Sequence, residues 1–502
     1  MRTMTLAEVA DAVNGRLIGG EDAARLTIDA VHTDTRALAA ATATHAVLFV
    51  ALRGERFDAH DYLPQAAAAG ARAALVSRAA GSLDGDGVLP QVLVEDTERA
   101  LGALAAYLHR ARATRTLAVT GSNGKTSVKT LLYAILEAAA SAQGGVAYVN
   151  PGNRNNEIGL PLAVLDAPED ALYAVYEMGA GKPGDIAYLC EIAPPVSSLV
   201  NNIGAAHLER LGSLFGVADT KAAIYDALPA DGAAAINVDD AFATYFETRV
   251  LDGGAQRRLI RFGLDHDADL TAHDIALEAD GARFVLRTPE GEAPVRIAMP
   301  GRHNVLNALA AAALAMGVGI GLAHIVAGLQ AARPVGGRLV SHRLAGGVTL
   351  IDDSYNANPS SLDAAIDTLA TTPGARWLVI GDMRELGTDG AALHAGCGRR
   401  AKASGIDRLY ALGELSAAAV EAFGEGARHF EDHAALADAL AAELHAYRAA
   451  GQGTQIATRA TGDGLRVLVK GSRGSAMDRI VQALLAREGD AGDTDRGDHH
   501  AA

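Results

Sequence analysis

The chain has 502 residues, of which 49% are hydrophobic and 21% are charged, so it is longer than one hydrophobic core supports. We expect a folded protein of two to four domains. The formal net charge of −16, without any Lys/Arg run, argues against nucleic acid as a partner, although a local basic pocket can still hold an anionic nucleotide. The two cysteines, Cys190 and Cys397, lack metal-ligand spacing and fit a reducing compartment.

The N-terminal stretch has no apolar core of the kind found in signal peptides, which predicts a cytoplasmic location. Residues 308–323 are free of charged side chains, but this run is short for a membrane span and contains three glycines, Gly317, Gly319 and Gly321. We expect a buried helix followed by a glycine-rich turn, and no membrane insertion.

Residues 1–112 are expected to form a first domain. Short β-like runs occur at residues 46–52 and 73–77. Polar loops at residues 32–36 and 53–62 accompany them, and such loops are more often solvated turns than ligand sites.

Residues 113–333 are expected to form a central domain that starts with an apolar strand at 117–119, a glycine loop and a helix from Ser127. Such a loop directs backbone N–H groups and a helix N-terminus at a polyphosphate, while Lys125 supplies positive charge and Thr126 a hydroxyl for Mg²⁺. The usual phosphate-loop pattern would have glycine where Val119 stands, so this loop is a variant. The alternative is an ordinary strand-to-helix turn.

Further apolar runs at residues 146–149, 172–176, 198–200 and 233–238 alternate with helical segments, which predicts a parallel α/β sheet. Ligands of such sheets bind beyond the carboxyl ends of the strands, where Glu177 and His207 follow two of these runs. Residues 260–300 alternate between polar and apolar positions and are broken by turn residues, which predicts a small antiparallel appendage.

Residues 334–337 indicate a hinge before a third domain, expected to span residues 334–488. Strand-like runs at 349–352, 377–381, 408–412 and 466–469, with helices between them, predict a second α/β unit. Residues 489–502, rich in Gly and Asp, are expected to form a disordered tail.

Several polar residues beyond the phosphate loop are candidates for chemistry. Mg²⁺ prefers oxygen ligands, so Glu177 is a stronger metal candidate than His207, which would more often be structural. Lys221 taken alone would be a surface lysine. Residues 301–307 open a helix with polar groups, which simple capping would also explain.

At this point several motifs together resemble the Mur ligase family and, within it, the dipeptide-adding member. The resemblance covers the chain to about residue 485 and rests on residues 120–129, 150–162, 177–179, 202–209, 300–307, 352–359, 381–387 and 470–473. The shortened phosphate loop also belongs to this family. Ala59 departs from the pattern, in a loop where relatives often have Gly.

The resemblance implies an α/β protein of three domains: a UDP-moiety-binding domain, a central phosphate-loop ATPase domain with a parallel sheet, and a Rossmann-like C-terminal domain. It further implies that ATP phosphorylates the terminal carboxylate of a UDP-N-acetylmuramoyl-tripeptide, and that the amine of D-alanyl-D-alanine attacks the acyl phosphate. This is a step of peptidoglycan synthesis. The implied cofactors are ATP and two Mg²⁺ ions, one held with the help of a carbamylated Lys221, and a monomer is expected.

The resemblance also distributes roles among residues. The implied catalytic residues are Lys125, Lys221, His207 and Glu177, and the implied metal ligands are Thr126, Glu177, His207 and Lys221. Implied ATP-binding residues are Gly121, Ser122, Asn123, Gly124, Lys125, Thr126, Ser127, Asn304, Arg338 and Asp353. Implied substrate-binding residues are Asp34, Thr35, Arg36, Arg53, Asn155, Asn156, Glu157, Tyr355, Asn356 and Asn358.

Two alternatives remain open from the sequence. The nearest is a sibling ligase that adds meso-diaminopimelate, lysine or glutamate, although residues 155–157 and 354–359 favour the dipeptide-adding member. The second is a phosphate-loop switch or kinase whose third domain is a binding module.

Overall fold

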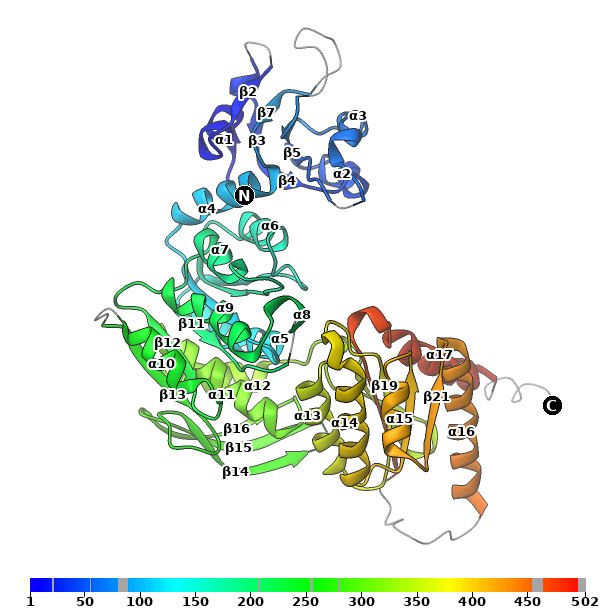
Figure 1. Cartoon of the computed structure of the whole chain (residues 1–502). Coiled ribbons are helices and arrows are strands. Elements are labelled where there is room, and N and C mark those ends of the chain that lie inside the picture. Colours follow the sequence, from blue (N-terminus) through cyan, green and yellow to red (C-terminus); the bar gives the residue numbers. More distant parts are fainter. Residues whose placement is uncertain are drawn as a thin grey trace, which may run out of the picture.

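The computed structural model describes residues 1–19, 22–54, 56–79, 89–205, 208–252, 256–278, 280–453 and 464–494. Three α/β units follow one another along the chain, each with its own main sheet (Figure 1). The α/β class with a central parallel sheet, predicted from the alternating apolar runs, is confirmed.

The first unit is built on a five-stranded sheet of order β2-β7-β6-β5-β4, parallel except for β2. Its strands are β2 (Arg16–Ile18), β4 (Ala30–His32), β5 (Val47–Val50), β6 (Ala73–Val76) and β7 (Gln91–Leu93), and β1 (Met4–Thr5) pairs separately with β3 (Thr27–Ile28). The helices are α1 (Leu6–Ala12), α2 (Thr35–Ala41), α3 (Leu63–Ala68) and α4 (Thr97–Arg110). The two predicted runs correspond to β5 and β6, and the remaining strands are too short to give a sequence signal.

The central unit contains six parallel strands in the order β13-β12-β11-β8-β10-β9. These are β8 (Arg115–Thr120), β9 (Val146–Val149), β10 (Ala171–Glu177), β11 (Ser197–Val200), β12 (Ala233–Asn237) and β13 (Arg258–Phe262). The crossover helices are α5 (Lys125–Ala142), α6 (Gly159–Asp166), α7 (Asp185–Ile192), α8 (Leu208–Leu211), α9 (Leu214–Asp226) and α10 (Ala243–Leu251).

Strand β8 lies between β11 and β10 in the interior of this sheet, and both of its faces are buried. Leu117 and Val119 pack on the side of α5, whereas Ala118 belongs to the core on the opposite face. After β8 the chain builds β9 and β10 on one side and β11 to β13 on the other, so the direction of winding switches at β8. A ligand crevice is expected at the carboxyl end of a strand in that position.

Helices α11 (Arg302–Gly317) and α12 (Leu322–Ala331) complete the central unit, with the antiparallel strands β14 (Thr271–Glu278), β15 (Gly281–Thr288) and β16 (Gly291–Ile297) at its edge. The predicted antiparallel appendage is confirmed for β14 to β16 but was wrong for residues 260–262. Those residues belong to β13, where Ile260 and Phe262 are buried against the main sheet.

The charge-free stretch at 308–323 comprises the buried part of α11, the glycine-rich turn and the first two residues of α12, so the expected buried helix and turn are confirmed. Among the described residues, no helix combines the length and apolar character that crossing a membrane requires.

The third unit has a sheet of order β17-β18-β22-β19-β20-β21, parallel except for β17. Its strands are β17 (Val340–Leu344), β18 (Val348–Asp353), β19 (Ala375–Gly381), β20 (Arg408–Leu412), β21 (Ala427–Phe430) and β22 (Leu465–Lys470). Its helices are α13 (Pro359–Ala370), α14 (Gly390–Ala403), α15 (Ala417–Phe423), α16 (His433–Gly453) and α17 (Asp478–Thr494).

Helix α17 corrects the expected start of a disordered tail at residue 489. It continues through Thr494, and its part before residue 489 is anchored by the buried Ile480, Val481 and Leu484 and by Glu488, which accepts a hydrogen bond from the backbone N–H of Ala345. Residues 495–502 lie outside the described residues.

Candidate functional site

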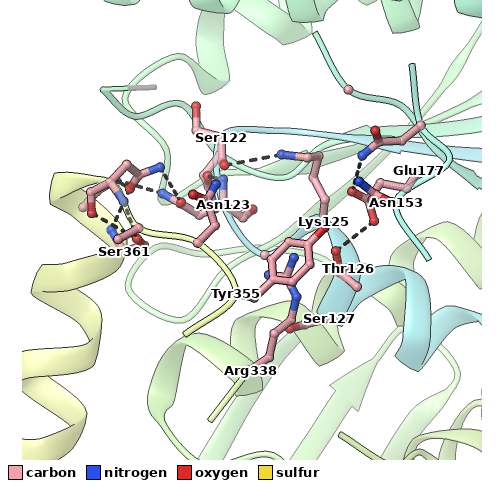
Figure 2. Close-up of a pocket in the computed structure, with 18 of the residues that line it drawn as sticks. Ser122, Asn123, Lys125, Thr126, Ser127, Asn153, Glu177, Arg338, Tyr355 and Ser361 are labelled. Atoms are coloured by element: carbon pink, nitrogen blue, oxygen red, sulfur yellow. Dashed lines mark hydrogen bonds between the residues drawn. The ribbon is translucent and has the colours of Figure 1, made fainter. Parts of the chain in front are cut away.

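A cleft of about 710 Å³ lies between the central and third units, at the carboxyl end of β8. Figure 2 shows Lys125, Thr126 and Glu177 of the central unit together with Arg338 and Tyr355 of the third unit around this cleft. Of the predicted ATP-binding residues, all except Gly121 line this cleft. The structure thus brings together residues that are more than 200 positions apart in the sequence.

The phosphate loop has a backbone that requires glycine at two positions. Gly121 and Gly124 have φ values of 144° and 77°, in a region that favours glycine. A Cβ atom on Gly124 would also lie 2.5 Å from side-chain amide atoms of both Asn201 and Asn307. The loop is therefore packed tightly from behind and opens toward the cleft.

Lys125 begins α5 and folds over the loop. Its Nζ donates hydrogen bonds to the carbonyls of Gly121, at 2.7 Å, and Ser122, at 3.4 Å. Burial lowers the pKa of Lys125, and the nearby Glu177 carboxylate partly opposes this effect. The cation is thus held at the N-terminal end of a helix, where an anion is also favoured by the helix dipole.

Glu177 ends β10 next to the phosphate loop, because residue 177 is in register with Val119 of β8. Its Oε2 accepts a hydrogen bond from Thr126 Oγ1 at 2.9 Å, and its Oε1 accepts one from Asn155 Nδ2 at 2.8 Å. Burial raises the pKa of Glu177, but the positive charges of Lys129, Lys125 and Arg338 outweigh burial and the net pKa is lowered. The hydroxyl and carboxylate are the oxygen donors that Mg²⁺ prefers, so this pair fits a magnesium ion.

Lys129 is a buried residue of this site to which the sequence analysis gave no role. Its Nζ lies 3.4 Å from Glu177 Oε2 and donates hydrogen bonds to the carbonyls of Asn150 and Gly152, at 3.1 and 2.9 Å. It follows Lys125 by four positions, which places both lysines on one face of α5. This four-residue spacing is the sequence signal that could have identified Lys129 as a site residue.

We expect Lys129→Met to destabilise the central unit by about 3 kcal/mol, because it removes the cation that stabilises the buried Glu177 carboxylate most and leaves two carbonyls without their donor. The thermal unfolding midpoint of the variant measures this loss. Lys402→Met is the matched control, since Lys402 is exposed, donates to the carbonyl of Glu425, lies over the ring of Phe423 and, within the described residues, pairs with no carboxylate. A Lys129→Met protein as stable as this control would contradict the assignment.

Lys221 lies on α9 and is not a surface lysine, so that alternative is wrong. Only 1% of the residue is exposed, and it lines the cleft. Burial lowers its pKa to about 7, and the charge of Lys125 contributes in the same direction. His207, its predicted neighbour, lies outside the described residues, and within those described no cluster of three His, Cys, Asp or Glu side chains could hold a metal.

Asn304 lines the cleft, but both ends of its side-chain amide already have partners. Its Nδ2 donates to the carbonyl of Pro300 at 2.7 Å, and its Oδ1 accepts from Asn307 Nδ2 at 3.0 Å. Asn307 in turn accepts from Asn201 Nδ2, which also donates to the backbone carbonyl of Asn123. This chain of amides connects the start of α11 to the phosphate loop.

The third unit contributes a cationic and aromatic wall. The Arg338 guanidinium lies 4.3 Å from the centre of the Tyr355 ring, and Arg473 lies 5.3 Å from the same ring. Asp353 Oδ2 accepts a 2.6 Å hydrogen bond from Lys470 Nζ, which also donates to the carbonyl of Asn356. Arg338 and Asp353, predicted to reach ATP from beyond the hinge, therefore both lie on the cleft.

The predicted substrate-binding residues fall into two separate places. The cleft is lined by Asn155, Asn156, Glu157, Tyr355, Asn356 and Asn358. In contrast, Asp34, Thr35, Arg36 and Arg53 lie in the first unit and do not line the cleft.

At the first-unit location, Asp34 caps α2 through the backbone N–H of Arg36, whose side chain is 89% exposed and pairs with the same carboxylate. Hydrogen bonds from Arg36 lower the pKa of Asp34 to about 2. Arg53 forms an isolated β-bridge with Asp58.

Comparison with known proteins matches two parts of the chain to family models, the Mur ligase middle domain at residues 119–315 and the Mur ligase, glutamate ligase domain at residues 337–473. A UDP-N-acetylmuramoyl-tripeptide–D-alanyl-D-alanine ligase of Escherichia coli is 44% identical over 96% of this chain and 99% of its own length.

Two solved structures are similar over almost the whole chain. MurF from Acinetobacter baumannii has a TM-score of 0.85 at 31% identity and covers 97% of this chain and 99% of its own. MurF ligase from Thermotoga maritima in complex with ADP has a TM-score of 0.76 at 25% identity and covers 92% and 99%. The chain therefore belongs to the Mur ligase family.

Proposed function

We propose that the protein is an ATP-dependent ligase that adds D-alanyl-D-alanine to UDP-N-acetylmuramoyl-tripeptide and releases ADP and phosphate, a step of peptidoglycan synthesis. The observation that carries this proposal is the cleft between two units, where the phosphate loop faces both the loop of residues 153–157 and the Arg338–Tyr355 wall. A cleft of this kind can hold a nucleotide and two further reactants together. The Escherichia coli relative that is 44% identical is, by its name, a ligase of this kind.

The chemistry follows from what each side of the cleft offers. The tripeptide carboxylate oxygen attacks the γ-phosphorus of ATP, the bond from that phosphorus to the bridging oxygen breaks, and ADP leaves. Lys125 and the N-terminus of α5 stabilise the charge on the transferring phosphoryl group. Mg²⁺ bound by Thr126 and Glu177 would supply further charge neutralisation.

In the second step the free amine of D-alanyl-D-alanine attacks the acyl carbon and phosphate departs, with loss of the amine proton. We assign the dipeptide to the third-unit side of the cleft near Tyr355 and Asn356, and the tripeptide to the loop with Asn155, Asn156 and Glu157. The UDP group is assigned to the first unit, at Asp34, Thr35, Arg36 and Arg53. ATP is assigned to residues 121–127, with Arg338 and Asp353 from the third unit.

We also propose that the chain acts as a monomer and that it acts in the cytoplasm, where ATP is supplied. Asn304 lines the cleft and stays among the residues assigned to ATP, with its amide oriented by one hydrogen bond to Pro300 and one from Asn307. We propose that it holds α11 and the phosphate loop in place around the nucleotide.

The deciding experiment measures ADP release with each reactant omitted in turn. We expect release to need both the UDP-muramoyl-tripeptide and D-alanyl-D-alanine, with the tripeptide supplied in its diaminopimelate and its lysine form. A phosphate-loop switch would hydrolyse ATP without them. A sibling ligase would respond to diaminopimelate, lysine or glutamate instead of the dipeptide, and either result would overturn the proposal.

Domain closure is a further expected property, because Arg338 and Asp353 follow the 334–337 hinge yet must reach ATP held by the central unit. We expect the radius of gyration in solution to fall when an ATP analogue and UDP-tripeptide are added together, as the third unit rotates onto the central one. Small-angle scattering measures this change. An unchanged radius would contradict a closing rotation.

A further inference from the structure

Within the described residues, the phosphate loop makes direct hydrogen bonds to the third unit through the side chain of Asn123. Its Nδ2 donates to Ser360 Oγ at 2.8 Å, and its Oδ1 accepts from Asn358 Nδ2 at 2.8 Å. Ser360 Oγ in turn donates to Asn358 Oδ1 at 3.2 Å. Figure 2 shows dashed hydrogen bonds in the region between Asn123 and Ser361.

The three side chains form a closed ring in which each donates once and accepts once, all in the same direction. Hydrogen bonds arranged in this way polarise one another and strengthen the set. Two of the three bonds cross between the units. The ring can therefore form only when the third unit lies against the phosphate loop.

We propose that Asn123, Asn358 and Ser360 are a closing latch, a set of positioning residues through which docking of the third unit fixes the phosphate loop for catalysis. This inference rests on the proposed ligase function. It also changes the expected role of Asn358 from substrate binding to positioning, since both of its amide atoms are used within the protein.

The backbone of Asn123 explains how the latch would act on the loop. Its N–H donates to Asn202 Oδ1 at 2.8 Å, and its carbonyl accepts from Asn201 Nδ2 at 3.0 Å. The residue is thus held through both its N–H and its carbonyl by the two residues that follow β11. Because the backbone of Asn123 is fixed in this way, hydrogen bonds to its side chain also restrain the position of the phosphate loop.

The use of Asn rather than another capping residue at position 358 supports the same inference. Asn358 Oδ1 accepts from the backbone N–H of Ser361 at 2.9 Å and so caps α13. Ser, Thr or Asp would cap equally well, but none of them offers an N–H₂ group. That group is the one that reaches across to Asn123.

Gly204 allows the close approach that the latch needs. A Cβ atom at this position would lie 2.7 Å from Ser360 Oγ. The backbone N–H of Gly204 is itself bonded to Ser122 Oγ at 2.9 Å, so the glycine is fixed beside the phosphate loop. A side chain there would push Ser360 away.

The test compares Ser360→Ala with Ser361→Ala in the full-length enzyme. Ser360→Ala removes two ring bonds, and we expect kcat to fall about fivefold to tenfold, as for the loss of ordinary net hydrogen bonds, with KM for the UDP substrate unchanged. Ser361→Ala removes a hydroxyl whose bonds stay within the third unit, to the backbone of Asn358, and we expect kcat within about twofold of wild type.

Amide hydrogen exchange supplies a readout that does not depend on turnover. With an ATP analogue bound, Ser360→Ala should speed exchange in the phosphate-loop segment on the other side of the interface, whereas Ser361→Ala should affect only the first turn of α13. Unchanged exchange in the phosphate loop of Ser360→Ala would overturn the latch even if the wild-type enzyme proved to use other substrates.

A double-mutant cycle completes the test. If the latch exists, Ser360→Ala should cost much less in an Asn123→Ala background than in wild type, because the partner is already lost. Additive losses would show that Ser360 acts elsewhere and would overturn the inference. Wild-type activity with the named substrates, measured first, separates this outcome from a failure of the proposed function.

Discussion

Lys125→Ala should lower kcat by about 10³-fold, the loss expected when a preorganised charge that stabilises a transferring phosphoryl group is removed. Lys125 Nζ is within 2.7 Å of the carbonyl of Gly121, and so lies inside the loop that would surround the phosphates. Affinity for the UDP substrate should change little, because the residues assigned to the UDP group lie in the first unit. Steady-state kinetics and calorimetric titration of the UDP substrate measure the two effects.

Lys402→Ala is the matched control, since this exposed lysine of α14 lies outside the cleft. Its kinetics should match those of the wild type. Wild-type turnover in Lys125→Ala would remove the phosphate loop from the mechanism. Loss of UDP-substrate affinity equal to the loss of turnover would show instead that the variant damages the fold.

The buried parallel strands could be predicted because each is apolar on both faces, as in residues 117–119 of β8. The edge strand β9 was also predicted, from its apolar run at residues 146–149, but the two edge strands of the third unit gave no such signal. In β21, Arg428 and His429 are exposed, and β17 is half exposed along its length, so neither has a continuous apolar run. Edge strands of this kind are identified only by pairing with a neighbour.

The placement of Lys125, Thr126 and Glu177 side by side could be predicted, because polar residues follow the ends of neighbouring parallel strands there. Pairings between distant segments could not. The Lys470–Asp353 ion pair joins residues 117 positions apart, and the Asn123–Ser360 bond joins residues 237 apart. The first contact follows from the pairing of β18 with β22 inside the third unit, and the second from the way the central and third units meet. No local pattern encodes either one.

Lys221 offers a test of the metal site that can be decided chemically. The residue is buried beside the cleft and its pKa is lowered to about 7, so near neutral pH a large share of its amine is uncharged. Only the uncharged amine can add CO₂, and the product is an anionic carbamate with two oxygens. An ammonium in the same place would repel Mg²⁺, whereas a carbamate oxygen is a ligand that Mg²⁺ accepts.

We expect Lys221→Ala to be nearly inactive and to be partly rescued by formate or acetate, whose oxygens can occupy the space left by the carbamate. Lys221→Arg should not be rescued, because the guanidinium keeps its charge and fills that space. ¹³C-labelled bicarbonate should give a carbamate signal by NMR in the wild type and none in either variant, independently of activity. Full activity of Lys221→Ala, or an active wild-type enzyme without that signal, would leave Lys221 as a buried amine with no role in binding metal.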